Sequence, residues 1–326
     1  MLSSLTISAA QAQAPNLSSV TDIDHVVREQ VDSGFSGVVL VARRGIPILQ
    51  RAYFPKGGPR ISVDDWFAIG SMTKGFTAAA IILLQNDHKL AIEDSIGRFF
   101  PDAPPDKRGI TIIDLLSHRS GLQGRYAGQG ITDRDSAVRS ILSAPLKAPP
   151  GSQYEYIDDD YELLAAIIEV ASRKSWQSYV KEKILDKLDM KHTGFEGTDW
   201  AHRGAAGMTS TAEDLFRWLT PQRRRQVMGE SVARQLDRPL VLVRREPPLD
   251  VYYGYGTRLY LDGGNVTEIM HSGSAENGAT SIARILLEGH TIIVLSRAGS
   301  HGGTTWASYV AQKISPRPHE AGGSNR

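Results

Sequence analysis

The chain has no cysteine among its 326 residues, and its charges almost cancel, with 37 Lys and Arg against 36 Asp and Glu. Without cysteine, disulfide frameworks, thiol nucleophiles, thiolate zinc sites and iron–sulfur clusters are excluded. The balanced charge removes the electrostatic basis for nucleic-acid binding. No apolar run reaches the roughly 18 residues of a membrane-spanning helix. What remains is a composition with 41% hydrophobic residues, typical of a globular protein with room for about two domains.

Signature motifs for cofactors and metals are also absent. The chain has no G-x-G-x-x-G fingerprint, no Walker A loop, no H-E-x-x-H motif and no G-x-S-x-G nucleophile elbow. Its 9 histidines lack the close pairing of a metal site. The acidic run 158–160 lacks further oxygen ligands at alternate spacing, so it indicates a solvated turn before a helix rather than a cation site. We therefore expect no cofactor and no metal.

The order of predicted elements places strands near both ends of the chain and helices between them. The hydrophobic periodicity predicts helices over 21–32, 76–85, 160–171, 176–188, 211–219 and 305–314. Strands are predicted over 37–43, 46–52, 255–261, 266–271, 280–286 and 291–296. This order predicts an α/β (α+β) fold in which both ends build one domain and a mainly helical domain is inserted. A cleft between two such domains is a preferred place for a small-molecule site.

The domain boundaries follow from this order. Residues 17–74 and 240–314 are expected to form a discontinuous α/β domain, and 75–239 the inserted helical domain. Residues 1–16 are uncharged and hold small-x-small sites, so they are either a frayed start or the remnant of an export signal. The protein is accordingly expected in the periplasm or secreted, with the cytoplasm as the alternative. Residues 315–326 are expected to be a disordered tail.

The strongest chemical signal is a serine and a lysine three residues apart, Ser71 and Lys74. On a helix this spacing puts both side chains on one face, and a lysine in a desolvated cleft can accept the serine proton. The apolar run 76–84 continues the helix into a core, which places Ser71 at a buried helix N-terminus that favours developing negative charge. Ser178 and Lys181 have the same spacing, but their charged neighbours indicate an exposed surface pair.

Five segments in order resemble the serine β-lactamase and penicillin-binding superfamily, and the resemblance covers nearly the whole chain. The relatives on its class C side are class C β-lactamases, family VIII carboxylesterases, DD-peptidases and D-aminopeptidases. The similar segments are FAIGSMTKGFT at 67–77, DLLSHRSGL at 114–122, PGS at 150–152 with YID at 156–158, GMTSTAEDL at 207–215 and HSGS at 271–274. The resemblance implies a β-lactamase/transpeptidase-like fold, an antiparallel sheet flanked by helices with an inserted helical domain.

The resemblance also assigns roles to the nucleophile segment and its partners. Ser71 would attack a carbonyl to give an acyl-enzyme, and Lys74 would act as base or as the electrostatic partner of Tyr156. Tyr156 would carry the leaving-group proton and later activate water. Tyr154 is the alternative tyrosine, and the spacing from the Pro-Gly pair favours Tyr156.

The segment at 271–274 would supply the substrate wall. His271 would flank the cleft on an edge strand and hydrogen-bond or attract an anionic substrate group. Gly273 would let a substrate lie close to the strand. The backbone N–H groups of Ser71 and Ser274 would form the oxyanion hole.

One residue departs from the family pattern, because Asp158 stands where the family has an asparagine. An ionised carboxylate can only accept hydrogen bonds, and it would hold Lys74 protonated and weaken it as a base. Asp158 would also border the substrate. His118 and Arg119 are interpreted as structural, since the family uses that segment to cap a helix and turn the chain.

The resulting hypothesis is a serine hydrolase acting on a small-molecule ester, β-lactam or peptide, esterase- or peptidase-like rather than an efficient β-lactamase. The alternative is a non-catalytic penicillin-binding or sensor protein that keeps the fold. No nucleic-acid partner and no integral membrane segment are expected, and the oligomeric state is left open.

Overall fold

The structure is a computed structural model that describes residues 19–124, 127–197, 199–200, 202–275, 277–302 and 304–317. The possible signal remnant at 1–16 lies outside the described residues. Within those residues, no helix has both the length and the apolar character needed to cross a membrane.

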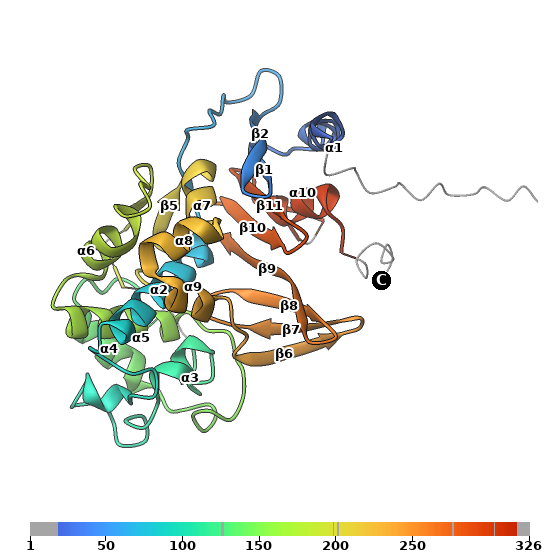
Figure 1. The fold of residues 1–326 in the computed structure, drawn as a ribbon. Coiled ribbons are helices and arrows are strands. Elements are labelled where there is room, and N and C mark those ends of the chain that lie inside the picture. The colour runs from blue at the N-terminus through green and yellow to red at the C-terminus, as the bar shows by residue number, and fades with distance from the viewer. Residues whose placement is uncertain are drawn as a thin grey trace, which may run out of the picture.

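An eight-stranded sheet built from both ends of the chain forms the framework of the fold (Figure 1). Its strand order is β2-β1-β11-β10-β9-β8-β7-β6, and every neighbouring pair is antiparallel. The strands are β1 (Gly37–Arg43), β2 (Ile46–Tyr53), β6 (Val241–Glu246), β7 (Leu249–Tyr253), β8 (Arg258–Asp262), β9 (Asn265–Ser274), β10 (Thr280–Leu286) and β11 (His290–Ser296).

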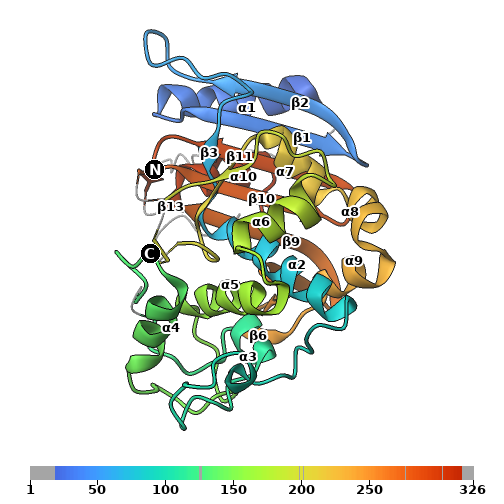
Figure 2. The same ribbon diagram turned by 90° about the vertical axis from the view of Figure 1, so that its left-hand side faces the viewer.

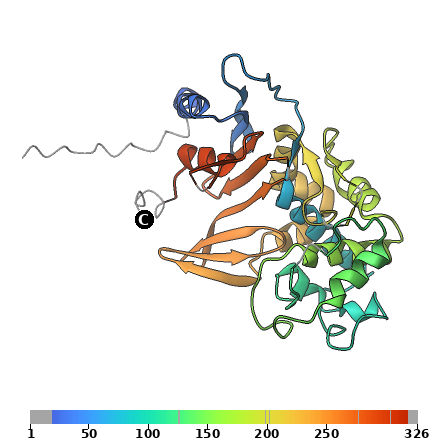
Figure 3. The same ribbon diagram turned by 180° about the vertical axis from the view of Figure 1, so that it is seen from behind.

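Helices cover both faces of this sheet (Figures 1 and 3). The first and last helices, α1 (Val20–Asp32) and α10 (Trp306–Ile314), pack together on one face. The helices on the other side are α2 (Thr73–Asn86), α3 (Ile112–Leu116), α4 (Arg134–Ser143), α5 (Asp159–Ser172), α6 (Trp176–Val180), α7 (Ala212–Leu219), α8 (Pro221–Met228) and α9 (Glu230–Leu236). Figure 2 shows α2 and α5 near the middle of this helical layer.

Short elements complete the described chain. A three-stranded sheet has the order β3-β5-β4. These and the remaining elements are β3 (Phe67–Ala68), β4 (Gly194–Phe195), β5 (Met208–Ser210), β12 (Ser300–His301), β13 (Thr304–Thr305), the 3₁₀ turns η1 (Gly70–Met72) and η2 (Ile96–Arg98), and the π-helical turn η3 (Lys181–Leu185).

Strand β1 explains how the two layers are joined, because its side chains alternate between two cores. Val39 and Val41 pack with the core beneath α1 and α10. Val38 and Leu40 belong to the larger core that also contains α2 and α5. A strand buried on both faces reads as a continuous apolar run in sequence, as β1 does.

The structure confirms the predicted antiparallel sheet flanked by helices and moves the ends of several elements. The helix expected over 176–188 is divided into α6 and the turn η3. Strands β6 and β7 were not predicted. Strand β6 is at the sheet edge and only half buried, so its sequence has no clear alternation of apolar and polar residues. Where one domain ends and the other begins stays a prediction.

The expected tail at 315–326 is wrong at its start, because Ser315 and Arg317 are held by hydrogen bonds, and residues 318–326 lie outside the described residues. Arg317 is 7% exposed, and its Nη2 donates to Glu268 Oε1 on β9 at 2.9 Å. The Arg284 guanidinium donates to the carbonyl oxygen of Ser315 at 2.5 Å. The chain is therefore anchored to the sheet through Arg317.

Candidate active site

Ser71 lies in the 3₁₀ turn η1, which leads directly into α2 at Thr73. The preceding glycine makes this position possible. Gly70 has φ +49°, and a Cβ there would lie 2.5 Å from the carbonyl oxygen of Ser274 on β9. The turn can therefore sit directly against β9 only with glycine at position 70. The sequence predicted Ser71 at a helix N-terminus, and the structure places it in the turn that leads into that helix.

Lys74 is completely buried beneath Ser71. Its Nζ donates to Ser71 Oγ at 3.2 Å and to the carbonyl oxygen of Ala205 at 3.2 Å. A third hydrogen bond, to Asp158 Oδ1 at 2.5 Å, is also an ion pair. All three ammonium hydrogens therefore have acceptors, and one of these acceptors is the hydroxyl of Ser71.

The charge of Lys74 is set by two opposing effects. Burial lowers the pKa of Lys74, but its neighbours Tyr156 and Asp158 raise the pKa by more, so it lies above its usual value. The ammonium also lies 4.8 Å from the centre of the Tyr156 ring. Lys74 is thus a cation at neutral pH, which favours its role as electrostatic partner over that of general base.

Tyr156, not Tyr154, lines the cavity above Ser71. Two hydrogen bonds between His118 and the backbone on either side of Tyr156 hold it there, and we call them the His118 bracket. The N–H of Glu155 donates to the carbonyl oxygen of His118 at 2.9 Å, and the N–H of Ile157 approaches His118 Nδ1 at 3.4 Å. The His118 and Tyr156 ring centres are 4.4 Å apart. Both residues that flank Tyr156 in sequence are therefore fixed by one histidine.

His118 is in turn held by Asp160, as the two side chains are fully buried and their Nδ1 and Oδ2 atoms lie 3.0 Å apart. Burial lowers the pKa of His118 well below its usual value. Burial also raises the pKa of Asp160 well above its usual value. The expected solvated turn at 158–160 is wrong, because Asp159 and Asp160 are buried.

Glu162 is a supporting residue that the sequence reasoning missed. It is fully buried, and its two carboxylate oxygens accept hydrogen bonds from the N–H groups of Gly204 and Ala205 at 3.1 and 3.2 Å. These bonds fix the segment whose carbonyl oxygen binds Lys74. The available signal was an acidic side chain within the apolar part of a helix.

Strand β9 forms the opposite wall, with His271 and Ser274 lining the cavity. β9 is an interior strand, so the expected edge strand is wrong for the sheet as a whole. Its pairing with β8 ends at Met270, opposite Arg258, which leaves 271–274 without a strand partner on that side. Turn η1 contacts β9.

Gly273 allows a close contact that the sequence did not predict. A Cβ on Gly273 would lie 1.9 Å from the carbonyl oxygen of Ile69, in the chain entering η1. Gly273 also lines the cavity, and the close approach of a substrate to it stays a prediction. The oxyanion hole from the N–H groups of Ser71 and Ser274 stays a prediction.

His271 does not have the electrostatic character expected for attracting an anion. It is 7% exposed, and its Nδ1 lies 2.6 Å from the carbonyl oxygen of Ser272. Burial, together with the positive charges of Arg258 and Lys74, lowers the pKa of His271 to about 3. The cation on this wall is Arg258, which the sequence reasoning missed because a lone arginine at the start of a strand carries no motif.

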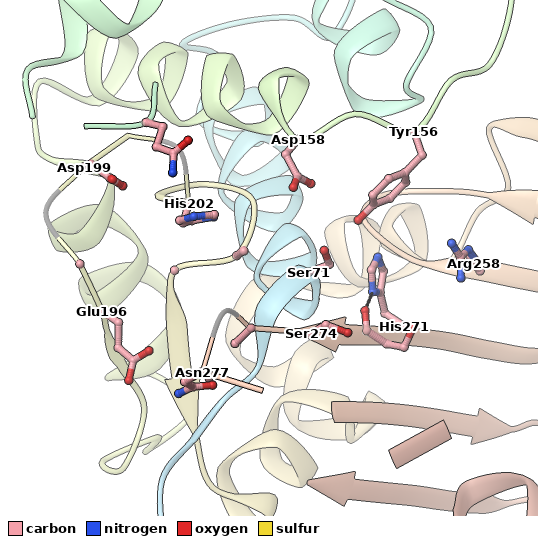
Figure 4. A pocket seen from close by; sticks show the side chains of 18 residues that line it. Ser71, Tyr156, Asp158, Glu196, Asp199, His202, Arg258, His271, Ser274 and Asn277 are labelled. Atoms are coloured by element: carbon pink, nitrogen blue, oxygen red, sulfur yellow. Dashed lines mark hydrogen bonds between the residues drawn. The ribbon is translucent and has the colours of Figure 1, made fainter. Parts of the chain in front are cut away.

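These residues surround a cavity of about 850 Å³ (Figure 4). Ser71 lies at its centre, with Tyr156 and Arg258 on one side and Glu196 and Asp199 on the other. The cavity is lined by Ala68, Ser71, Gln129, Tyr156, Asp158, Glu196, Gly197, Asp199, His202, Ala206, Gly207, Arg258, His271, Ser272, Gly273, Ser274, Ala275 and Asn277.

The second serine–lysine pair lies away from this cavity. Ser178 and Lys181 are both exposed. Lys181 pairs with Asp186, and the Ser178 hydroxyl accepts a hydrogen bond from Ser175 at 2.7 Å. Neither lines the cavity. The structure therefore gives no support to a nucleophile at Ser178.

Comparisons with known proteins agree with the fold. The putative penicillin-binding protein PbpX of Bacillus subtilis (strain 168) is 31% identical over 172 residues, which are 51% of this chain and 42% of that protein. The chain spans between 42% and 63% of the length of the first curated relatives it matches.

Two solved structures share the fold. The octameric penicillin-binding protein homologue from Pyrococcus abyssi superposes with a TM-score of 0.77 at 20% identity, covering 90% of this chain and 75% of that one. The D-amino acid amidase from Ochrobactrum anthropi SV3 gives 0.73 at 21% identity, covering 90% and 98%. A family model described as beta-lactamase matches residues 23–311. The chain therefore belongs to the beta-lactamase family.

Proposed function

We propose that the chain is a serine hydrolase that forms an acyl-enzyme on Ser71 and acts on small esters or peptide-like amides. The observation that carries the proposal is the hydrogen bond of 3.2 Å from Lys74 Nζ to Ser71 Oγ, at the centre of an open cavity of about 850 Å³. A serine hydroxyl oriented by a buried ammonium has the arrangement of a nucleophile. The similarity to a D-amino acid amidase supports amide substrates alongside esters.

The proposed reaction uses Tyr156 as the proton carrier. As Ser71 Oγ bonds to the carbonyl carbon, its proton passes to the Tyr156 oxygen while the Tyr156 hydroxyl proton passes to the leaving group, so that the tyrosine is neutral before and after the step. The Lys74 cation stabilises negative charge on these oxygens. The N–H groups of Ser71 and Ser274 stabilise the tetrahedral oxyanion. Water then cleaves the acyl bond, and Tyr156 carries its proton to Ser71.

Asp158 supports a preference for esters over β-lactams within this proposal. Its carboxylate takes one Lys74 hydrogen bond and keeps the ammonium protonated. A charged lysine is a weak base, so the enzyme depends on leaving groups that depart without strong base catalysis. Esters leave more readily than amide nitrogens, which favours esterase-like activity.

A non-catalytic binding protein is the second candidate, and the same ion pair favours it. In this candidate the Lys74–Asp158 ion pair holds the lysine in an inactive charge state. Such a protein would bind β-lactams or peptides in the cavity without turning them over.

Hydrolysis rates on three substrates test the proposal. Wild type, Ser71→Ala and Ser178→Ala are compared on a short-chain ester, a cephalosporin and a D-alanyl peptide. We expect turnover of at least one substrate, a loss of roughly 10³-fold or more in Ser71→Ala, and wild-type rates in Ser178→Ala, whose serine is exposed. Turnover that survives Ser71→Ala would contradict the proposal.

A further inference from the structure

We propose that His271 offers a hydrogen-bond acceptor to the substrate's leaving group, so that the enzyme favours leaving groups that carry a hydroxyl. This inference rests on the proposed acyl transfer at Ser71 and adds a specificity that the transfer itself does not require. This acceptor role takes the place of the predicted attraction between His271 and an anionic substrate group.

The tautomer of His271 follows from its short contact with the main chain. Nδ1 lies 2.6 Å from the carbonyl oxygen of Ser272. A carbonyl oxygen can only accept a hydrogen bond, so Nδ1 must carry a proton. The dashed line in Figure 4 marks this bond. In a neutral imidazole with Nδ1 protonated, Nε2 is left with a free lone pair.

The surroundings of His271 keep the ring neutral. Burial lowers its pKa, and the positive charges of Arg258 and Lys74 lower it further, to about 3. At neutral pH an imidazole with such a pKa does not take a second proton. Nε2 is therefore an acceptor and not a donor.

This acceptor is a buried atom without a partner, on a residue that lines the cavity. His271 is 7% exposed and lines the cavity. Among the described residues, its Nε2 has no hydrogen-bond partner. Nearly all buried polar atoms in proteins are paired, and an unpaired one lowers stability. A ligand that brings a donor to this point would satisfy Nε2.

The position of His271 assigns that donor to the leaving group. Figure 4 shows His271 on the same side of Ser71 as Arg258 and Tyr156, the proposed proton carrier to the leaving group, and all three line the cavity. Arg258 also lines the cavity, and its Nε has no partner among the described residues. A hydroxyl can donate to Nε2 and accept from Arg258 at once. A carboxylate has no hydrogen to donate and would face the lone pair of Nε2.

Two matched aryl esters test the inference. 3-Hydroxyphenyl acetate and 3-methoxyphenyl acetate have the same acyl group and similar leaving ability, and differ in the donor hydrogen. We expect wild type to favour the hydroxyl ester in kcat/KM by about three- to tenfold, the effect of one hydrogen bond. In His271→Phe, which keeps a ring but lacks Nε2, the ratio should fall close to one. In Ser178→Ala the ratio should equal that of wild type.

The ratio separates this inference from the proposed function. If wild type hydrolyses both esters equally and Ser71→Ala abolishes hydrolysis, Ser71 remains the nucleophile and the acceptor role of His271 is wrong. A preference that persists in His271→Phe also overturns the acceptor role. If hydrolysis survives Ser71→Ala, the proposed function fails and this inference fails with it.

A spectroscopic measurement is independent of any variant. In wild type with ¹⁵N-labelled histidine, we expect the His271 ring to be neutral at pH 7, with the proton on Nδ1. An imidazolium, or a neutral ring protonated on Nε2, would overturn the inference.

Discussion

At the scale of single residues, the charge of one lysine controls the chemistry available to Ser71. Lys74 has no solvent exposure, and its ammonium donates to Ser71, to Asp158 and to the carbonyl oxygen of Ala205. Burial alone would favour a neutral amine. The carboxylate of Asp158 opposes this, so a single substitution at position 158 can change the protonation of the site.

Asp158→Asn tests this control. The amide removes a negative charge, so the pKa of Lys74 should fall, since burial then acts with less opposition. We expect the basic limb of the pH profile, where the Lys74 cation loses its proton, to move to lower pH. The kcat/KM ratio of cephalosporin to short-chain ester should rise several-fold, because a neutral lysine can serve as a base. Rates for both substrates from pH 5 to 10 provide the measurement. A ratio and a profile equal to wild type would show that Asp158 does not set the substrate preference.

At the scale of structural elements, two connections place the reacting groups. The segment after α3 holds Tyr156 through the His118 bracket, and turn η1 places Ser71 beside β9. Both segments contain residues with positive φ, His118 at +56° and Gly70 at +49°. Each connection therefore contains a residue with positive φ, a backbone conformation that is unfavourable for most residues other than glycine.

The bracket around Tyr156 is tested by two variants of His118. His118→Asn keeps a polar atom near the position of Nδ1 and tolerates positive φ. His118→Phe keeps the ring contact and loses the hydrogen bonds with Ile157 and Asp160. We expect kcat to fall roughly tenfold to hundredfold in His118→Phe with little change in KM, and a partial recovery in His118→Asn. Equal kcat in both variants and wild type would mean that Tyr156 does not depend on the bracket.

The contact of η1 with β9 is tested by a matched pair of glycine substitutions. Gly70 and Gly263 have φ of +49° and +55°, but only at Gly70 would a Cβ meet backbone, 2.5 Å from the carbonyl oxygen of Ser274. Gly263→Ala should reduce the free energy of unfolding by about 1 kcal/mol. Gly70→Ala should reduce it by about 2 kcal/mol or more and lower activity as well. Urea unfolding and ester hydrolysis measure both, and equal losses would show that the contact is unimportant.

At the scale of the whole molecule, the C-terminal end of the described chain is attached to an interior strand of the sheet. Glu268 on β9 is 4% exposed and is held by Arg284 on β10 and by Arg317 beyond α10. Burial raises the pKa of Glu268, but the two arginines lower it by more, so it lies below the usual value of 4.5. Its contribution to stability is therefore present above pH 4.5 and is lost as the pH falls through the lower folded-state pKa.

Arg317→Ala tests this anchor. Removing one partner leaves the buried carboxylate with Arg284 alone, so the free energy of unfolding at pH 7 should fall by about 1.5–3 kcal/mol. The pKa of Glu268 should rise, and the acid loss of stability should begin at a higher pH. Urea unfolding from pH 3 to 7 measures both. Arg234→Ala, which breaks an exposed pair with Glu230, is the control with little expected change. A similarly small change in Arg317→Ala would show that the anchor is unimportant.

Much of the fold could be predicted because its signals are local. The apolar runs of β1 and β11 and the periodicity of α2 and α5 predict their elements. The motifs also identified Ser71, Lys74, Tyr156 and Asp158, which the structure brings together in one site.

The parts that sequence could not predict depend on tertiary contacts. Arg258 reaches the cavity only because β8 lies beside β9, and the charge state of His271 follows from its burial and from the two cations beside it. Gly273 is required by Ile69, which lies more than two hundred residues earlier in the printed sequence. Spacing within one sequence reports none of these contacts.

The central claim is that Ser71 is an activated nucleophile, and covalent labelling tests it most directly. Wild type, Ser71→Ala and Ser178→Ala are treated with a serine-reactive phosphonate, and the adduct is located by peptide mass spectrometry. The account predicts one adduct on the peptide containing Ser71, the same adduct in Ser178→Ala and none in Ser71→Ala. An unlabelled, folded wild type, or a label that persists in Ser71→Ala, would contradict it.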